Sequence, residues 1–195
     1  GIESNDKRLS SNEELLKCYV SQQKGSVKYI DEDEITKKYN FFKVITAEAN
    51  GKYKCFGNTF IGYKNEVHTG SYISFKVDTK QKAESLLSYL KCKLPNFMLS
   101  LRKISQHINK STCEWIPSPK LDRIWTDEQV YKYFKLSDRE IKLIKETQLV
   151  GYKDLPSITI GYYNNKEYYI LDEIMYEKLD NDIIGKKFGI KKPNG

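Results

Sequence analysis

Polar and basic side chains crowd one segment in the middle of the chain, residues 99–119, with the sequence LSLRKISQHINKSTCEWIPSP. Its first carboxylate is Glu114, so cations and amides precede any acidic group. Cations neutralise backbone phosphates, and the amides of Gln and Asn offer both donors and acceptors to base edges. These residue types indicate a nucleic-acid contact. The candidate DNA-binding residues of this segment are Arg102, Lys103, Gln106, Asn109 and Lys110.

These side chains need an element that presents them. Apolar residues recur at helical spacing and predict a helix with one stripe in the core. The stripe consists of Phe97, Met98, Leu101, Ile104 and Ile108. Pro95 suits the first turn, and the basic and amide side chains lie mostly on the other faces. An ordinary solvated helix face explains the same pattern, so both interpretations stay open. Residues 115–117, Trp-Ile-Pro, are expected to close the core after the helix.

A second stretch with binding potential is residues 50–64, NGKYKCFGNTFIGYK, which holds three glycines and alternating aromatics. The Asn-Gly pair predicts a tight turn, and the stretch is typical of a loop or irregular hairpin. Its aromatic rings could stack on nucleic acid, or they could cover the edge of a sheet. The candidate groove contacts here are Lys52, Tyr53, Asn58, Tyr63 and Lys64.

The remaining pattern mixes strands and helices. Strands are predicted at residues 27–30, 42–47, 72–77, 158–163 and 167–171, the last two joined by a turn at Asn164-Asn165. Residues 31–38 predict a helical turn, and residues 78–92 a helix that begins with a capping box of Asp78 and Gln81. Two further helices begin at Thr126 and Ser137. Residues 185–195, which are basic and glycine-punctuated, are expected to be loose.

This order predicts an α+β fold with a mixed, mainly antiparallel sheet, packed helices and a C-terminal hairpin. We divide the chain into a lead-in, residues 1–24, a central domain, residues 25–150, and a C-terminal extension with the hairpin, residues 151–195.

Charge and cysteine usage narrow the class of partner. The chain has 195 residues and a formal net charge of +7, which weakly favours a polyanionic partner. No apolar run approaches the roughly 20 residues that span a bilayer, so no membrane association is expected. The four cysteines form no CxxC pair and predict free thiols in a reducing cytoplasm.

Motifs for catalysis are missing from the sequence. It has no GxGxxG, no P-loop and no GxSxG. Its two histidines, His68 and His107, have no second histidine at metal-binding spacing. The Asn-Pro-Pro-Tyr signature of an amino-group DNA methyltransferase is also absent. We therefore select no catalytic residue and no metal ligand.

Six segments, in order over residues 25–146, carry a resemblance to a known family: GSVKYIDEDEI, FFKVITAEANG, IGY, GSYISFKVDTKQKAESLLSYLKCK, FMLSLRKISQHINKSTCEWIP and IWTDEQVYKYFKLSDREIKLIKE. Together they resemble the C-terminal target-recognition region of Eco57I-like type II restriction–modification enzymes and related N6-adenine DNA methyltransferases. The Lys-x-Ser-Gln-His core at residues 103–107 and the Trp-Thr-Asp-Glu segment at residues 125–134 match motifs of that region.

The resemblance implies a duplex DNA recognition domain that positions a separate methyltransferase or endonuclease domain on its target. It implies no cofactor in this segment, whereas the parent enzyme would use S-adenosylmethionine and Mg²⁺. It also leaves structural roles open for Ser105, bonding back along its helix, and for His107, fixing the following loop. Two alternatives remain: a stand-alone metal-dependent DNA nuclease, and a protein-interaction module whose tyrosine-rich hairpin adds a strand to a partner.

Overall fold

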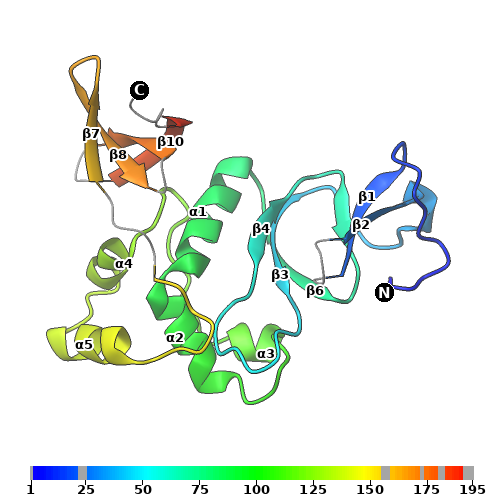
Figure 1. Cartoon of the computed structure of the whole chain (residues 1–195), viewed down its shortest axis with the longest axis horizontal. Coiled ribbons are helices and arrows are strands. Elements are labelled where there is room, and N and C mark those ends of the chain that lie inside the picture. Colours follow the sequence, from blue (N-terminus) through cyan, green and yellow to red (C-terminus); the bar gives the residue numbers. More distant parts are fainter. Residues whose placement is uncertain (1, 22–25, 155–158, 172–173, 180–182, 191–195) are drawn as a thin grey trace.

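The computed structural model describes residues 2–21, 26–154, 159–171, 174–179 and 183–190. Over these residues it contains five α-helices and three sheets, which confirms the predicted mixed α+β class. One sheet lies at each end of an elongated molecule, and the third lies beside the helices in the middle (Figure 1). Among the described residues, no helix has both the length and the apolar character needed to span a bilayer.

The central sheet has the order β4-β3-β6 and is antiparallel throughout. Its strands are β3 (Phe42–Ala47), β4 (Thr59–Gly62) and β6 (Tyr72–Val77). Residues 43–47 of β3 are all buried, as expected of a middle strand covered on both faces. The strands predicted at 42–47 and 72–77 are confirmed.

Helices cover the central sheet and enclose the main core. Their bounds are α1 (Lys80–Lys91), α2 (Lys93–Arg102), α3 (Lys110–Cys113), α4 (Asp127–Tyr133) and α5 (Asp138–Glu146). Trp125, only 1% exposed, packs in this core with Val44, Leu90 and Leu99. Such a large buried ring contributes several kcal/mol to the stability of a domain, on the order of 3–5 on truncation.

Helix caps explain where most of these helices begin. Thr126 accepts a hydrogen bond from the main-chain N–H of Gln129, and Ser137 forms a reciprocal capping box with Glu140, as predicted. The predicted box at Asp78 is wrong, because Thr79 caps α1 by accepting from Lys82 N. The helical turn predicted at residues 31–38 is shortened to a 3-10 helix, Glu32–Glu34, capped by Asp31.

The N-terminal sheet has the order β2-β1-β5. Strand β1 (Leu16–Ser21) pairs antiparallel with β2 (Ser26–Ile30) and parallel with β5 (Glu66–His68). Residues 1–24, expected as a lead-in, therefore contribute a strand. A second small core of Cys18, Ile30 and Val67 lies under this sheet, and Ile2 and Leu9 pack against it.

The C-terminal sheet has the order β10-β9-β8-β7. Its strands are β7 (Thr159–Tyr163), β8 (Lys166–Leu171), β9 (Ile174–Leu179) and β10 (Ile183–Ile190). The predicted hairpin turn is confirmed: Asn164 and Asn165 both have positive φ, 49° and 59°. The expectation of a loose segment is wrong for residues 185–190, which belong to β10, while residues 191–195 lie outside the described residues.

Candidate nucleic-acid interface

Helix α2 stops at Arg102, well short of the predicted Ile108. Lys103 has φ −79° and ψ 89°, which leaves the helical region, and the chain then runs back toward the end of β3. Leu101 and Ile104, assigned to the core stripe, are consequently 54% and 94% exposed. Phe97 and Met98 do pack against the core, and Ile108 is fully buried, but from a separate segment.

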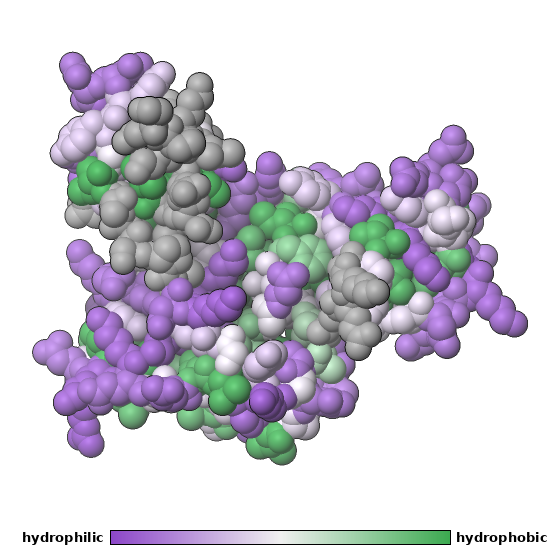
Figure 2. All heavy atoms as spheres, viewed as in Figure 1, coloured by the Kyte–Doolittle hydropathy of each residue, from purple (hydrophilic) through white to green (hydrophobic). Residues whose placement is uncertain are grey.

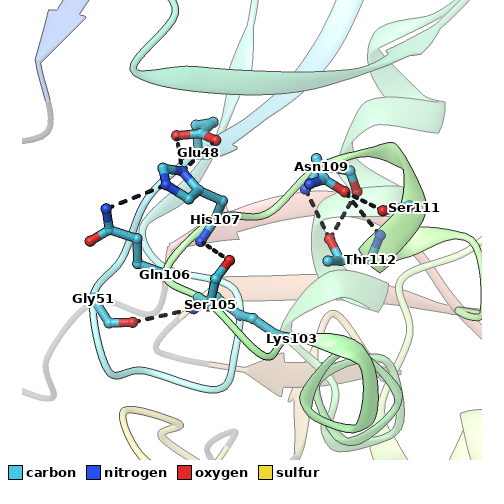
Figure 3. A network of polar contacts seen from close by, with 9 residues as sticks. All are labelled: Glu48, Gly51, Lys103, Ser105, Gln106, His107, Asn109, Ser111 and Thr112. Atoms are coloured by element: carbon cyan, nitrogen blue, oxygen red, sulfur yellow. Dashed lines mark hydrogen bonds and ion pairs between the residues drawn. The ribbon is translucent and has the colours of Figure 1, made fainter.

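The side chain of Lys103 explains why the helix ends there. Its Nζ donates to the main-chain oxygens of Gly51 (3.3 Å), Tyr53 (2.9 Å) and Ser105 (2.9 Å). Three acceptors use the three N–H groups of an ammonium completely. Lys103 is 1% exposed, and burial, together with the nearby Lys54 charge, lowers its pKa. Its predicted role as a phosphate contact is therefore wrong, and it instead ties two loops together (Figure 3).

Main-chain hydrogen bonds complete this connection. Asn50 N donates to the oxygen of Gln106 over 3.1 Å, and Ile108 N donates to the oxygen of Glu48 over 2.6 Å. Lys54 Nζ adds a bond to the oxygen of Lys103 over 2.6 Å. The two segments selected separately from the sequence thus lie side by side. We define the junction surface as six of their exposed side chains: Lys52, Tyr53, Ile104, Gln106, Asn109 and Lys110.

A side-chain hydrogen bond between His107 and Glu48 spans the same junction. His107 Nδ1 lies 2.8 Å and 3.0 Å from the two carboxylate oxygens of Glu48, and His107 N donates to Ser105 Oγ over 3.3 Å (Figure 3). Both partners are partly exposed, so the pair adds little stability but orients the loop. His107 thus fixes the chain between α2 and α3, while Ser105 bonds forward to His107 rather than back along a helix.

Asn109 serves as the N-cap of α3. Its Oδ1 accepts from Thr112 N over 3.1 Å and from Ser111 Oγ over 2.8 Å, and Asn109 N donates to Thr112 Oγ1 over 2.9 Å (Figure 3). The capping box therefore occupies Oδ1, the acceptor atom of the Asn109 side-chain amide. Lys110 follows at the first helical position and is exposed. Over the described ranges, neither Lys110 nor Lys52 forms an ion pair with a carboxylate.

Arg102 has an aromatic partner. Its guanidinium carbon lies 4.3 Å from the ring centroid of Trp115, a cation–π stack, and Trp115 is 52% exposed. The expectation that Trp115 closes the core is therefore wrong, although Ile116 does pack against that core. Arg102 is half-buried and stands beside the junction surface rather than on a free helix face.

Tyr63 and Lys64, the other part of the predicted set, lie elsewhere. Strand β4 runs between Asn58 and Tyr63, with Thr59 opposite Thr46 and Gly62 opposite Lys43 in the register with β3. The ring of Tyr63 meets that of Phe42 edge-on, and Lys64 Nζ lies 5.5 Å from the Phe42 ring. The Asn58 end of β4 lies beside the end of β3, and Tyr63 follows five residues later. Five residues of a strand span about 17 Å, so Tyr63 and Lys64 lie far from the junction surface.

The sequence analysis placed Ile104 in the core because its position fits the helical spacing of the apolar stripe, whereas Ile104 is exposed. The available signal was the run from Ser105 to Asn109, since Ser and Asn bond to neighbouring backbone groups and favour caps over helix interiors. The buried position of Lys103 had no local signal, because two of its three acceptors, Gly51 O and Tyr53 O, lie about fifty residues away in the sequence.

The junction surface offers two cations, two amides, one aromatic ring and one apolar side chain. In the described part of the chain, no group of three His, Cys, Asp or Glu side chains that could hold a metal occurs. Comparisons of the chain with protein-family models, with curated proteins and with solved structures find no match.

Proposed function

We propose that this chain is a sequence-specific duplex DNA recognition domain that contacts DNA through its junction surface. The observation that carries the proposal is the set of three Lys103 hydrogen bonds, which join residues 51–53 to residues 103–105. A surface held in place by hydrogen bonds of a buried lysine loses little conformational entropy on binding. The same hydrogen bonds leave Lys52 and Lys110, without carboxylate partners among the described residues, exposed to solvent.

The side chains of this surface match the two parts of DNA recognition. Lys52 and Lys110 suit phosphate contacts, which position a protein on the duplex. The amide of Gln106 suits a bidentate contact to adenine, and Ile104 suits a thymine methyl group. The view in Figure 2 shows a largely hydrophilic face with small, separate apolar groups, as suits a polar partner.

Under this proposal the chain supplies specificity, and a separate methyltransferase or endonuclease domain supplies the chemistry. S-adenosylmethionine and Mg²⁺ would then belong to that other domain, and the complex would act on DNA in the cytoplasm. The support for this wider assignment is the order of the six sequence segments over residues 25–146.

The test is the salt dependence of duplex binding, measured by fluorescence anisotropy with a labelled 30-base-pair duplex of random sequence. Each phosphate contact contributes a slope of about −0.9 in the plot of log affinity against log salt concentration. The double variant Lys52→Ala/Lys110→Ala removes two such contacts, so its slope should be less negative by about 2. The control is Lys28→Ala, an exposed lysine on β2, which should leave the slope unchanged. An unchanged slope in the double variant would exclude this surface.

A second function has a specific observation in its favour. Strand β7 forms an edge of its described sheet, and it exposes Ile160 (50%) and Tyr162 (72%). An exposed edge strand can pair with a strand of another protein. Under this second function, Ile160→Lys/Tyr162→Lys should abolish co-purification with a protein partner and leave DNA affinity unchanged.

A further inference from the structure

A cavity of about 650 Å³ lies near the start of β3, away from the junction surface. Its walls come from the segment around the 3-10 helix, from Lys64 after β4, and from the end of β6. Four lysines line it: Lys37, Lys38, Lys64 and Lys76. We call this cavity the lysine groove.

The acidic groups at the groove have other partners. Glu32 accepts a hydrogen bond from the Tyr39 hydroxyl, and Asp78 pairs with Lys82 over 2.7 Å. Within the residues that the structure describes, no carboxylate pairs with the four lysines of the groove. The lining thus holds four ammonium groups and two carboxylates, of which Asp78 is also paired with Lys82, and a net positive charge in a cleft concentrates anions. The groove therefore favours an anion.

A buried lysine holds the walls of the groove together. Lys43, 2% exposed, donates from Nζ to the main-chain oxygens of Tyr39 (3.1 Å), Tyr63 (3.0 Å) and Glu66 (2.6 Å). These bonds connect the segment before β3 to the turn between β4 and β5. The arrangement repeats that of Lys103 at the other end of the sheet, so the groove is preformed.

Two lysines of the groove lie over aromatic rings. Lys76, opposite Lys43 in the sheet register, places Nζ 4.9 Å from the centroid of the Phe41 ring. Lys64 stands over Phe42. Rings of this kind hold the lysine stems in place and leave the ammonium groups with free donors for phosphate oxygens.

We propose that the lysine groove binds phosphate groups, carried by a nucleic-acid backbone or by a free nucleotide. The cavity volume falls within the range of about 300–1,000 Å³ that is usual for ligand sites. The proposal does not depend on the junction surface, since the two sites share no residue.

The experiment compares two probes and two variants by isothermal titration calorimetry. The probes are inorganic tripolyphosphate and a 30-base-pair DNA duplex. The groove variant is Lys64→Gln/Lys76→Gln, and the matched control is Lys52→Gln/Lys110→Gln. All four positions are exposed, so both variants should fold, which circular dichroism checks. We expect the groove variant to bind tripolyphosphate at least tenfold more weakly than the unaltered protein, and the control variant to bind it equally.

The duplex then identifies the source of the phosphate. Weaker duplex binding in the groove variant supports a nucleic-acid backbone, and loss of tripolyphosphate binding alone supports a free nucleotide. Duplex binding that depends on the groove but not on Lys52 and Lys110 would support the groove and overturn the proposed DNA surface. Equal affinity of the groove variant and the unaltered protein for both probes, or no binding of either probe, would overturn the groove.

Discussion

The ammonium nitrogen of Lys103 lies 2.9 Å from the main-chain oxygen of Tyr53, fifty residues earlier in the chain. This hydrogen bond, with those to Gly51 and Ser105, turns a residue expected on the surface into a buried staple. The consequence is a connected pair of loops that expose Lys52 and Lys110 to solvent.

The first prediction concerns this staple. Lys103→Met keeps the aliphatic stem but leaves three carbonyl oxygens without their donor, so it should lower the free energy of unfolding by about 2–4 kcal/mol. Urea denaturation measures the change. Lys52→Met, an exposed lysine of the same loop, is the matched control and should change stability by less than about 0.5 kcal/mol. Equal stability of the two variants would contradict the structural role of Lys103.

The second prediction concerns pH. Burial raises the pKa of Asp127 to about 6, while its Oδ1 accepts from Lys93 N over 2.6 Å at the start of α2. Glu128 and Asp154 add to the rise, and the Lys93 charge opposes it. Because the folded protein then binds more protons than the unfolded chain between about pH 4 and 6, this group's contribution to stability decreases as pH rises through that window.

Asp127→Asn retains an acceptor for Lys93 N and removes the buried charge. The difference in free energy of unfolding between Asp127→Asn and the unaltered protein should therefore shift by about 1–3 kcal/mol in favour of the variant from pH 4 to pH 7. Urea melts at four pH values measure it, and the carboxylates common to both proteins cancel in the difference. Parallel curves would show that the Asp127 pKa is not raised.

The third prediction concerns Gly151. Its φ is +87°, and a Cβ at this position would lie 2.4 Å from an atom of the Tyr53 ring. Gly51 also has a positive φ, +61°, but a Cβ there meets nothing within 4 Å. Gly51→Ala should therefore cost about 1 kcal/mol for the backbone alone, and Gly151→Ala about 2–4 kcal/mol for backbone and clash together. Thermal denaturation of both variants gives the comparison, and a larger loss at Gly51 would refute the Tyr53 contact.

The fourth prediction separates the two tryptophans. Trp125, 1% exposed, donates from Nε1 to the oxygen of Lys120 over 3.2 Å, whereas Trp115 is 52% exposed against Arg102. Trp125→Ala should cost about 3–5 kcal/mol, and Trp115→Ala less than about 1.5 kcal/mol. Guanidinium denaturation distinguishes them, and similar losses would place Trp115 in the core after all.

The fifth prediction concerns Ile104. At 94% exposure it contributes nothing to the core, so Ile104→Ser should change the melting temperature by less than about 2 °C. If Ile104 contacts a thymine methyl, selection from a pool of randomised duplexes should show relaxed preference at one base pair. Leu101→Ser, 54% exposed on α2, is the control and should leave the selected sequence unchanged. Identical selected sequences for Ile104→Ser and the unaltered protein would remove Ile104 from the recognition surface.

Local patterns identified much of the fold. The caps at Thr126 and Ser137 and the Asn164-Asn165 turn depend on interactions between residues a few positions apart, and the strands at 42–47 and 72–77 have strongly apolar or alternating sequences. Strands β1, β4, β5, β9 and β10 were not predicted as strands, because short or polar strands acquire their conformation by pairing with a neighbour. For the same reason, the loose end expected at residues 185–190 became a strand of a four-stranded sheet.

By itself, the sequence determined the mixed α+β class, the basic character of the chain and the two segments rich in cations and amides. Tertiary structure alone decided which of those cations face solvent. An ammonium can donate to phosphate oxygens or to main-chain oxygens, and only the folded chain brings three carbonyls to Lys103 and three to Lys43. That choice left Lys52 and Lys110 exposed at one end of the central sheet and the lysine groove at the other.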